Sequence, residues 1–152
     1  MNFWLLKTEP EDWSWDQQVE CGDNGAEWNG VRNFQAAKNL KSMKKGDRCF
    51  FYHTGKIKSI VGIVKVIKEA FLDKTDKTQK FVAIIVRAQY PLKREVSLKE
   101  IKKNKVFRDF SLVKQSRLSV MKVDLKYWKK ICKMGKVYNL DYFYGKKKEK
   151  KN

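Results

Sequence analysis

Residues 28–39 combine more kinds of binding chemistry than any other stretch of the sequence. Trp28 offers a flat aromatic face, Gly30 leaves the backbone open to close approach, and Arg32 carries a planar fork of donors. Asn33 stands where a helix should begin, and a helix N-terminus presents unpaired N–H groups with partial positive charge. This combination suits a flat polar ligand such as a nucleobase. It equally suits a structural turn, with Trp28 in the core and Arg32 in a salt bridge.

Further groups that can bind a base lie elsewhere in the chain. Trp13 and Trp15 lie within 16 residues of Trp28, and an aromatic ring that stacks on a base contributes roughly 1–3 kcal/mol. His53 can hydrogen-bond to the edge of the base. The polar cluster at residues 114–117 (Lys-Gln-Ser-Arg) repeats the residue types of the first stretch. We therefore expect the two stretches to converge across the fold.

Catalytic and metal-binding patterns are missing from the sequence. No nucleophile elbow of the G-x-S-x-G type and no glycine-rich phosphate loop occurs. His53 is the only histidine, and Cys21, Cys49 and Cys132 are far apart, so we expect no metal site and no cofactor. A binding module is therefore the first interpretation. The alternatives are an enzyme acting on a nucleoside or RNA with His53 as acid or base, and a small-molecule-binding protein.

Length and hydropathy indicate one domain. The chain has 152 residues, of which 42% are hydrophobic, and this is enough for a sizeable core. No apolar run is long enough to span a membrane, and the N-terminus does not have the pattern of a signal peptide. We expect a cytoplasmic protein, or a nuclear one in a eukaryote. The domain should cover residues 1–144, followed by a disordered, lysine-rich tail at 145–152.

The net charge of +18 predicts a polyanionic partner, either DNA or RNA. The charge is uneven along the chain, because residues 1–28 contain seven acidic residues and one lysine, whereas residues 29–152 contain 34 basic and ten acidic residues. Of the basic residues, 29 are lysines, a bias that an AT-rich genome also produces. The oligomeric state is not indicated by the sequence.

Hydrophobic periodicity and capping residues predict the elements that position these groups. Strands are expected at 3–7, 48–53, 59–67, 81–88 and 118–123, with Pro91 closing the fourth strand region. Helices are expected at 14–21, 33–43, 97–103 and 124–134. Short strands without regular crossover helices favour a mixed α/β (α+β) fold, in the form of a small, mostly antiparallel, barrel-like sheet flanked by short helices.

The last helix places apolar residues on one face and lysines on the other. The lysines are candidates for contacts with the nucleic-acid backbone, although a solvated lysine face is the common alternative. They are Lys126, Lys129, Lys130 and Lys133.

Five blocks of the sequence, in order, resemble the EVE domain. They are WLLKTEP at 4–10, WNGVRNFQAAKN at 28–39, MKKGD with FFYH at 43–53, IVGIV with KEA at 60–70, and VKQSRLSV at 113–120. The resemblance covers residues 2–134, and the thymocyte nuclear protein family is the eukaryotic branch that the chain is similar to. Within residues 28–39, three positions depart from the family pattern: Asn29 replaces the commoner Asp, Phe34 replaces Tyr, and Lys38 replaces Arg. The block at 68–71 also lacks the Tyr-Pro that often follows Glu-Ala.

The resemblance implies a PUA-like fold, which is a small β-barrel with helices packed around it. It also implies a non-catalytic reader of a modified nucleobase, notably modified cytosine in DNA. The implied pocket takes residues from three blocks and from the first helix. They are Trp15, Trp28, Gly30, Val31, Arg32, Asn33, Tyr52, His53, Gln115, Ser116 and Arg117.

Overall fold

The computed structural model describes residues 1–138, so the lysine-rich tail expected at 145–152 lies outside the described residues. Six strands form one sheet in the order β2-β5-β4-β3-β1-β6. The strands are β1 (Phe3–Thr8), β2 (Ala26–Trp28), β3 (Arg48–His53), β4 (Ser59–Leu72), β5 (Val82–Ser97) and β6 (Val120–Val123). All neighbouring pairs are antiparallel except β1 and β3, which run parallel. The expected mixed, mostly antiparallel architecture is therefore confirmed.

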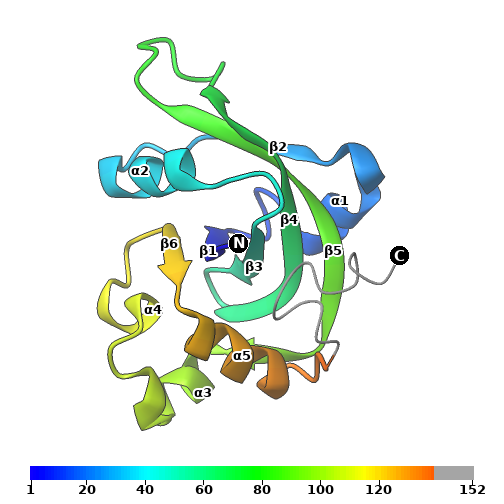
Figure 1. The fold of residues 1–152 in the computed structure, drawn as a ribbon, viewed down its shortest axis with the longest axis vertical. Coiled ribbons are helices and arrows are strands. Elements are labelled where there is room, and N and C mark those ends of the chain that lie inside the picture. Colours follow the sequence, from blue (N-terminus) through cyan, green and yellow to red (C-terminus); the bar gives the residue numbers. More distant parts are fainter. Residues whose placement is uncertain (139–152) are drawn as a thin grey trace.

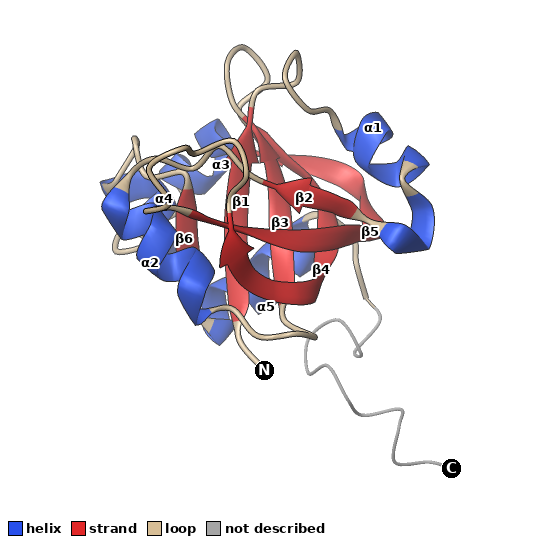
Figure 2. Ribbon diagram, turned by 90° about the horizontal axis from the view of Figure 1, so that it is seen from above, coloured by secondary structure: helices blue, strands red, loops and turns tan. Residues whose placement is uncertain are grey.

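Short helices surround the sheet (Figures 1 and 2). They are α1 (Trp15–Glu20), α2 (Phe34–Ser42), α3 (Leu98–Lys103), α4 (Ser111–Lys114) and α5 (Leu125–Met134), with 3₁₀ turns η1 (Gly22–Asn24) and η2 (Lys105–Phe107). None of the helices within residues 1–138 is long and apolar enough to cross a membrane.

The sheet curls without closing into the expected barrel. Strands β2 and β6 form its two edges, and no ladder joins them within the described part of the chain. Helix α2 packs against both β5 and β6 and so covers part of the gap between the two edges of the sheet (Figure 1). There the Asn39 side chain donates a hydrogen bond of 2.7 Å to the Val120 carbonyl at the start of β6. An exposed strand edge is thereby partly covered.

The predicted helix starts are confirmed where a local cap exists. Ser14 and Gln17 form a capping box before α1, Ser97 and Glu100 form one before α3, and Asn33 caps α2. Asp124 precedes α5 but makes no side-chain hydrogen bond to it.

Two strand predictions were too short. Strand β5 does not stop before Pro91 but continues to Ser97, and β4 extends to Leu72. Pro91 is tolerated because the register between β4 and β5 shifts beside it, so the ladder does not need its missing N–H. Strand β2 and helix α4 were not predicted, because three or four residues are too few to show a period.

A buried carboxylate just before β3 joins the N-terminal segment to the turn after α2. Asp47 is 2% exposed. It accepts hydrogen bonds from the Trp4 indole at 2.9 Å and from the backbone N–H groups of Asn2 at 3.1 Å and Lys44 at 3.0 Å. The turn after α2 is thereby fixed to β1, which lies between β3 and the edge strand β6.

Replacing Asp47 with Ala should destabilise the fold by about 2–3 kcal/mol, because it leaves buried N–H donors without acceptors. Urea unfolding followed by tryptophan fluorescence measures the change. Lys45→Ala is the matched control, since Lys45 is an exposed neighbour in the same turn and should shift stability by no more than about 0.5 kcal/mol. Equal unfolding midpoints for the two variants would contradict this role of Asp47.

Candidate functional site

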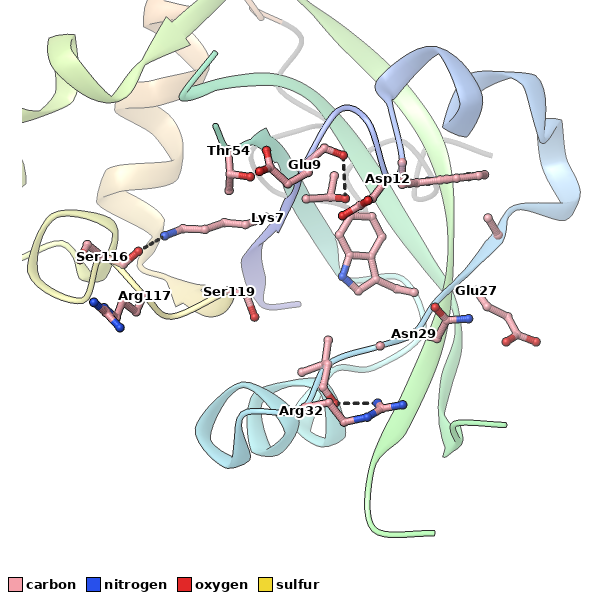
Figure 3. A pocket seen from close by; sticks show the side chains of 16 residues that line it. Lys7, Glu9, Asp12, Glu27, Asn29, Arg32, Thr54, Ser116, Arg117 and Ser119 are labelled. Carbon is pink, nitrogen blue, oxygen red and sulfur yellow. Dashed lines mark hydrogen bonds between the residues drawn. The ribbon is translucent and has the colours of Figure 1, made fainter. Parts of the chain in front are cut away.

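A cavity of about 770 Å³ opens where the two edges of the sheet fail to meet (Figure 3). Its walls come mainly from residues 7–9 at the end of β1, residues 26–32 around β2, and residues 116–119 before β6. Asp12, Trp13 and Thr54 complete it. This volume lies in the range of about 300–1,000 Å³ that is usual for small-molecule pockets.

The two stretches expected to converge do so. Trp28, Gly30, Val31 and Arg32 line the cavity together with Ser116 and Arg117. Asn33 and Gln115 also lie side by side, but they line a shallower neighbouring hollow. The Asn33 side-chain oxygen accepts a hydrogen bond of 2.9 Å from the Ala36 N–H, so it is engaged as the cap of α2.

Trp15 and His53 do not line the cavity but pack in the core around Phe51. The backbone N–H of Trp15 donates a hydrogen bond of 3.3 Å to His53 Nε2, and His53 Nδ1 lies 3.4 Å from the Thr8 carbonyl oxygen. Because both ring nitrogens face backbone groups, His53 is not placed to act as an acid or base on a ligand. The Trp15 ring fills a slot over Gly62, where any Cβ would lie 2.4 Å from it.

Tyr52 is also outside the cavity. It is 3% exposed, and burial raises the pKa of its hydroxyl to about 12. The Lys7 ammonium lies 5.6 Å from the centre of its ring and donates a hydrogen bond of 2.9 Å to the Ser116 carbonyl. Lys7 therefore separates the cavity from a smaller hollow that Tyr52 lines.

The wall formed by residues 28–32 is held by a carboxylate that the sequence analysis missed. Asp73, in the turn between β4 and β5, is 1% exposed. Its Oδ2 accepts hydrogen bonds from the Gly30 N–H at 2.8 Å and from Arg32 at 3.0 Å. Arg32 also donates to Thr75 at 2.9 Å and lies over the ring of Phe81. Arg32 therefore forms the salt bridge that the sequence analysis gave as the alternative to ligand binding, and its side chain also borders the cavity.

The hydrogen bonds to Asp73 also determine its ionisation. Burial opposes the charge, but hydrogen bonds from Thr75, Gly30 and Arg32 outweigh burial and lower the pKa of Asp73 to about 2. The signal for this turn is present in the sequence as two successive Asp-Lys-Thr triplets at 73–75 and 76–78. In each, the Asp side chain accepts from the N–H and the hydroxyl of the Thr two residues on, which is the usual Asx pattern.

The charges around the cavity are mixed rather than uniformly basic. Figure 3 shows Glu9 and Asp12 on one side and Arg32 opposite, with Lys7 and Arg117 along a third side. Burial lowers the pKa of Lys7. Trp13, which the sequence analysis named as a ring that could stack on a base, presents a half-buried ring to the cavity, and its indole N–H donates a hydrogen bond of 2.9 Å to the Gln18 side chain. The cavity thus offers aromatic faces, carboxylate acceptors and cationic donors.

The lysines proposed on the last helix are not near this cavity. Helix α5 follows Val123, which pairs with Phe3 at the start of β1, whereas the cavity lies beyond Lys7 at the other end of that strand. The structure therefore does not bring the cavity together with Lys126, Lys129, Lys130 and Lys133. No group of His, Cys, Asp and Glu side chains within the described residues is arranged to hold a metal ion.

Comparison with known proteins identifies relatives along nearly the whole chain. The model of the EVE domain matches residues 2–134. Chicken thymocyte nuclear protein 1 is 45% identical over 87 residues, which cover 51% of this chain and 36% of that protein. The chain spans between 36% and 64% of the length of the curated thymocyte nuclear proteins that it matches.

Solved structures share the fold. An NMR structure of a protein from Rhodopseudomonas palustris is 45% identical with a TM-score of 0.86, covering 91% of this chain and 96% of that one. The human THYN1 protein, solved in complex with DNA that contains 5-methylcytosine, is 24% identical with a TM-score of 0.84, covering 91% of this chain and 100% of that one.

Replacing Asp73 with Asn should destabilise the protein by about 2 kcal/mol near neutral pH. The folded-state pKa of about 2 lies below the reference value of 3.8, so the carboxylate contributes stability above that reference value. This contribution is lost as the pH falls from about 4 to about 2. Urea unfolding across this pH range measures it.

Glu95→Gln is the control for this measurement, because Glu95 is an exposed acid on β5. A stability difference between the wild type and Asp73→Asn that stays constant at every pH would show that the ionised carboxylate does not hold the wall.

Proposed function

Because the chain belongs to the EVE domain family, we propose that it is a nucleic-acid-binding module that holds a modified nucleobase in the cavity beside β2. One observation carries this proposal: aromatic rings and hydrogen-bonding groups from three separate segments line a single cavity. Trp13 and Trp28 supply flat apolar surface, and residues 29–32 and 116–117 supply polar groups. A base is a ligand that uses both kinds of surface.

The carboxylates at the rim favour a base with an exocyclic amino group. Cytosine presents such a donor at N4, and Asp or Glu is the usual acceptor for it. The Glu9 carboxylate lies against Gly55, where a Cβ would come within 2.6 Å of it. Asp12 is exposed on the same side of the cavity. We therefore assign recognition of the amino edge to Asp12.

A methyl group at cytosine C5 would add apolar surface next to Trp28 and Val31, which are each 7% exposed. Burying one such group contributes about 0.8 kcal/mol, or roughly a fourfold preference. A base flipped from a duplex also costs least to extrude when it is modified or unpaired. The human THYN1 protein bound to 5-methylcytosine DNA supports this choice of ligand.

The position of His53 argues against the enzyme alternative. The ring is 5% exposed, lies outside the cavity and has both nitrogens directed at backbone groups. We therefore propose binding without catalysis.

Replacing Trp13 with Ala should weaken binding to an oligonucleotide with one 5-methylcytosine by roughly 5- to 150-fold, the equivalent of about 1–3 kcal/mol of stacking. Trp13 is preferred to Trp28 for this test because it is half-buried and its loss should leave the core intact. Fluorescence anisotropy at fixed salt measures the affinity for DNA and RNA strands, plain and modified.

Phe71→Ala is the matched control, since Phe71 is a partly exposed aromatic residue that does not line the cavity. Base reading is wrong if no modified strand binds better than its plain counterpart and Trp13→Ala binds as tightly as the wild type.

Replacing Asp12 with Asn should reduce the preference for 5-methylcytosine over thymine by roughly 5- to 100-fold, because an amide also presents donors to the base edge. The readout is the ratio of the two dissociation constants. Glu27→Gln serves as the control, because Glu27 borders the cavity but points away from it in Figure 3. An unchanged ratio in Asp12→Asn would remove Asp12 from base recognition.

A further inference from the structure

A lysine-lined depression leads away from the cavity on the side of Lys7. A hollow of about 280 Å³ shares Lys7, Thr54 and Ser116 with the cavity. A second hollow of about 490 Å³ shares Lys58 and Lys102 with the first. Together they run from the cavity across the turn between β3 and β4 and onto α3. We call the exposed lysines along this path the lysine trough; they are Lys56, Lys58, Lys99 and Lys102.

The trough differs in charge from the cavity. Neither hollow is lined by an acidic residue, whereas the cavity has three. Within residues 1–138, none of the four lysines forms an ion pair. The acid on α3, Glu100, is occupied by Ser97 and Arg94. Four unpaired cations therefore face a channel that also has apolar surface from Leu98 and Ile57, which is 43% exposed.

The backbone holds this arrangement in an uncommon conformation. Lys58 has φ of +45°, in the left-handed region that long side chains seldom adopt. Its carbonyl accepts a hydrogen bond of 2.8 Å from the Leu98 N–H, which joins the β3–β4 turn to the start of α3. Local strain of this kind often occurs at binding sites. Here it brings the lysines of the turn next to those of the helix.

Charge also distinguishes the two directions in which a strand can leave the cavity. A strand that leaves on the side of α1 passes exposed carboxylates, including Asp16 and Glu20 on α1 and Glu27 on β2. Figures 1 and 2 place α1 and α3 on opposite sides of the molecule. Phosphates are repelled by the first side and attracted by the second. The acidic N-terminal segment thus directs a bound strand toward the lysines.

We propose that the lysine trough binds the sugar–phosphate backbone of the strand whose base occupies the cavity. This inference rests on the proposed function, and it assigns the backbone contacts to the β3–β4 turn and α3 instead of α5. Lys7, Thr54 and Ser116 mark the junction between base and backbone.

The test compares two fourfold variants of the full chain that change the net charge equally. One replaces all four trough lysines with Ala, and the other replaces Lys122, Lys126, Lys130 and Lys133, which are exposed on β6 and α5. Affinity for plain and 5-methylcytosine-containing DNA, as duplex and single strand, and for RNA of the same sequence is measured between about 50 and 200 mM salt.

In the trough variant the slope of log K against log salt should become shallower by roughly 3.6 for duplex DNA, at about 0.9 per lost phosphate contact. The ratio of modified to plain affinity should stay at its wild-type value, and the β6–α5 variant should keep the wild-type slope. A fourfold Lys→Arg variant of the trough retains the charge and should also keep the slope. If the fourfold Ala variant does not fold, the pairs Lys56/Lys58 and Lys99/Lys102 should each give about half of the change.

An unchanged slope in the trough variants, or an equal change in the β6–α5 variant, would overturn this inference while leaving base reading intact. A different outcome would refute the proposed base reading alone. In it, the wild type binds plain and modified strands equally, and the salt slope becomes shallower only in the trough variant. RNA binding with the expected slope would identify RNA as the strand, and failure to bind any of these strands would overturn both.

Discussion

The two edges of the sheet do not meet, and the rest of the molecule is arranged around that gap. An unpaired strand edge presents backbone N–H and C=O groups that need partners. Helix α2 covers part of the gap, and its Asn39 side chain satisfies the Val120 carbonyl of the edge strand β6. Beyond α2 the gap stays open and becomes the cavity. A closed barrel would have no opening at this position, so the cavity is a consequence of incomplete pairing.

The open wall of the cavity needs support from elsewhere, and Asp73 provides it. A carboxylate 43 residues distant in sequence fixes the Gly30 backbone, and it also fixes the Arg32 guanidinium from the turn between β4 and β5. Arg32 consequently acts on the shape of the site more than on the charge available to a ligand. The Asp73 hydrogen bonds fix this wall from within the protein, and a wall that is fixed in advance loses less conformational entropy when a ligand binds.

Much of the fold could be predicted from the sequence, because its signals are local. Each helix cap acts within three or four residues of its own position. The capping boxes at Ser14 and Ser97 and the N-cap at Asn33 start three helices where the sequence predicts them. Strand β3 was predicted with the bounds that it has in the structure, since four consecutive apolar and aromatic residues between Arg48 and His53 are easily recognised. Predictions failed where a neighbouring strand alters what a residue can do. Pro91 lies inside a strand because the β4–β5 register shifts beside it, with the extra residues on β5.

For the candidate site, the sequence by itself predicted that the stretches at 28–39 and 114–117 converge, and it determined that the charge is divided between an acidic start and a basic remainder. Only residues 28–32 and 116–117 of these stretches line the cavity. Tertiary structure alone decided that the Trp15 and His53 side chains pack on Phe51 instead of lining the cavity, and that α5 lies at the far end of β1. The physical reason is that a side chain's type is fixed by the sequence, whereas its direction and neighbours depend on strand register and on contacts between distant segments.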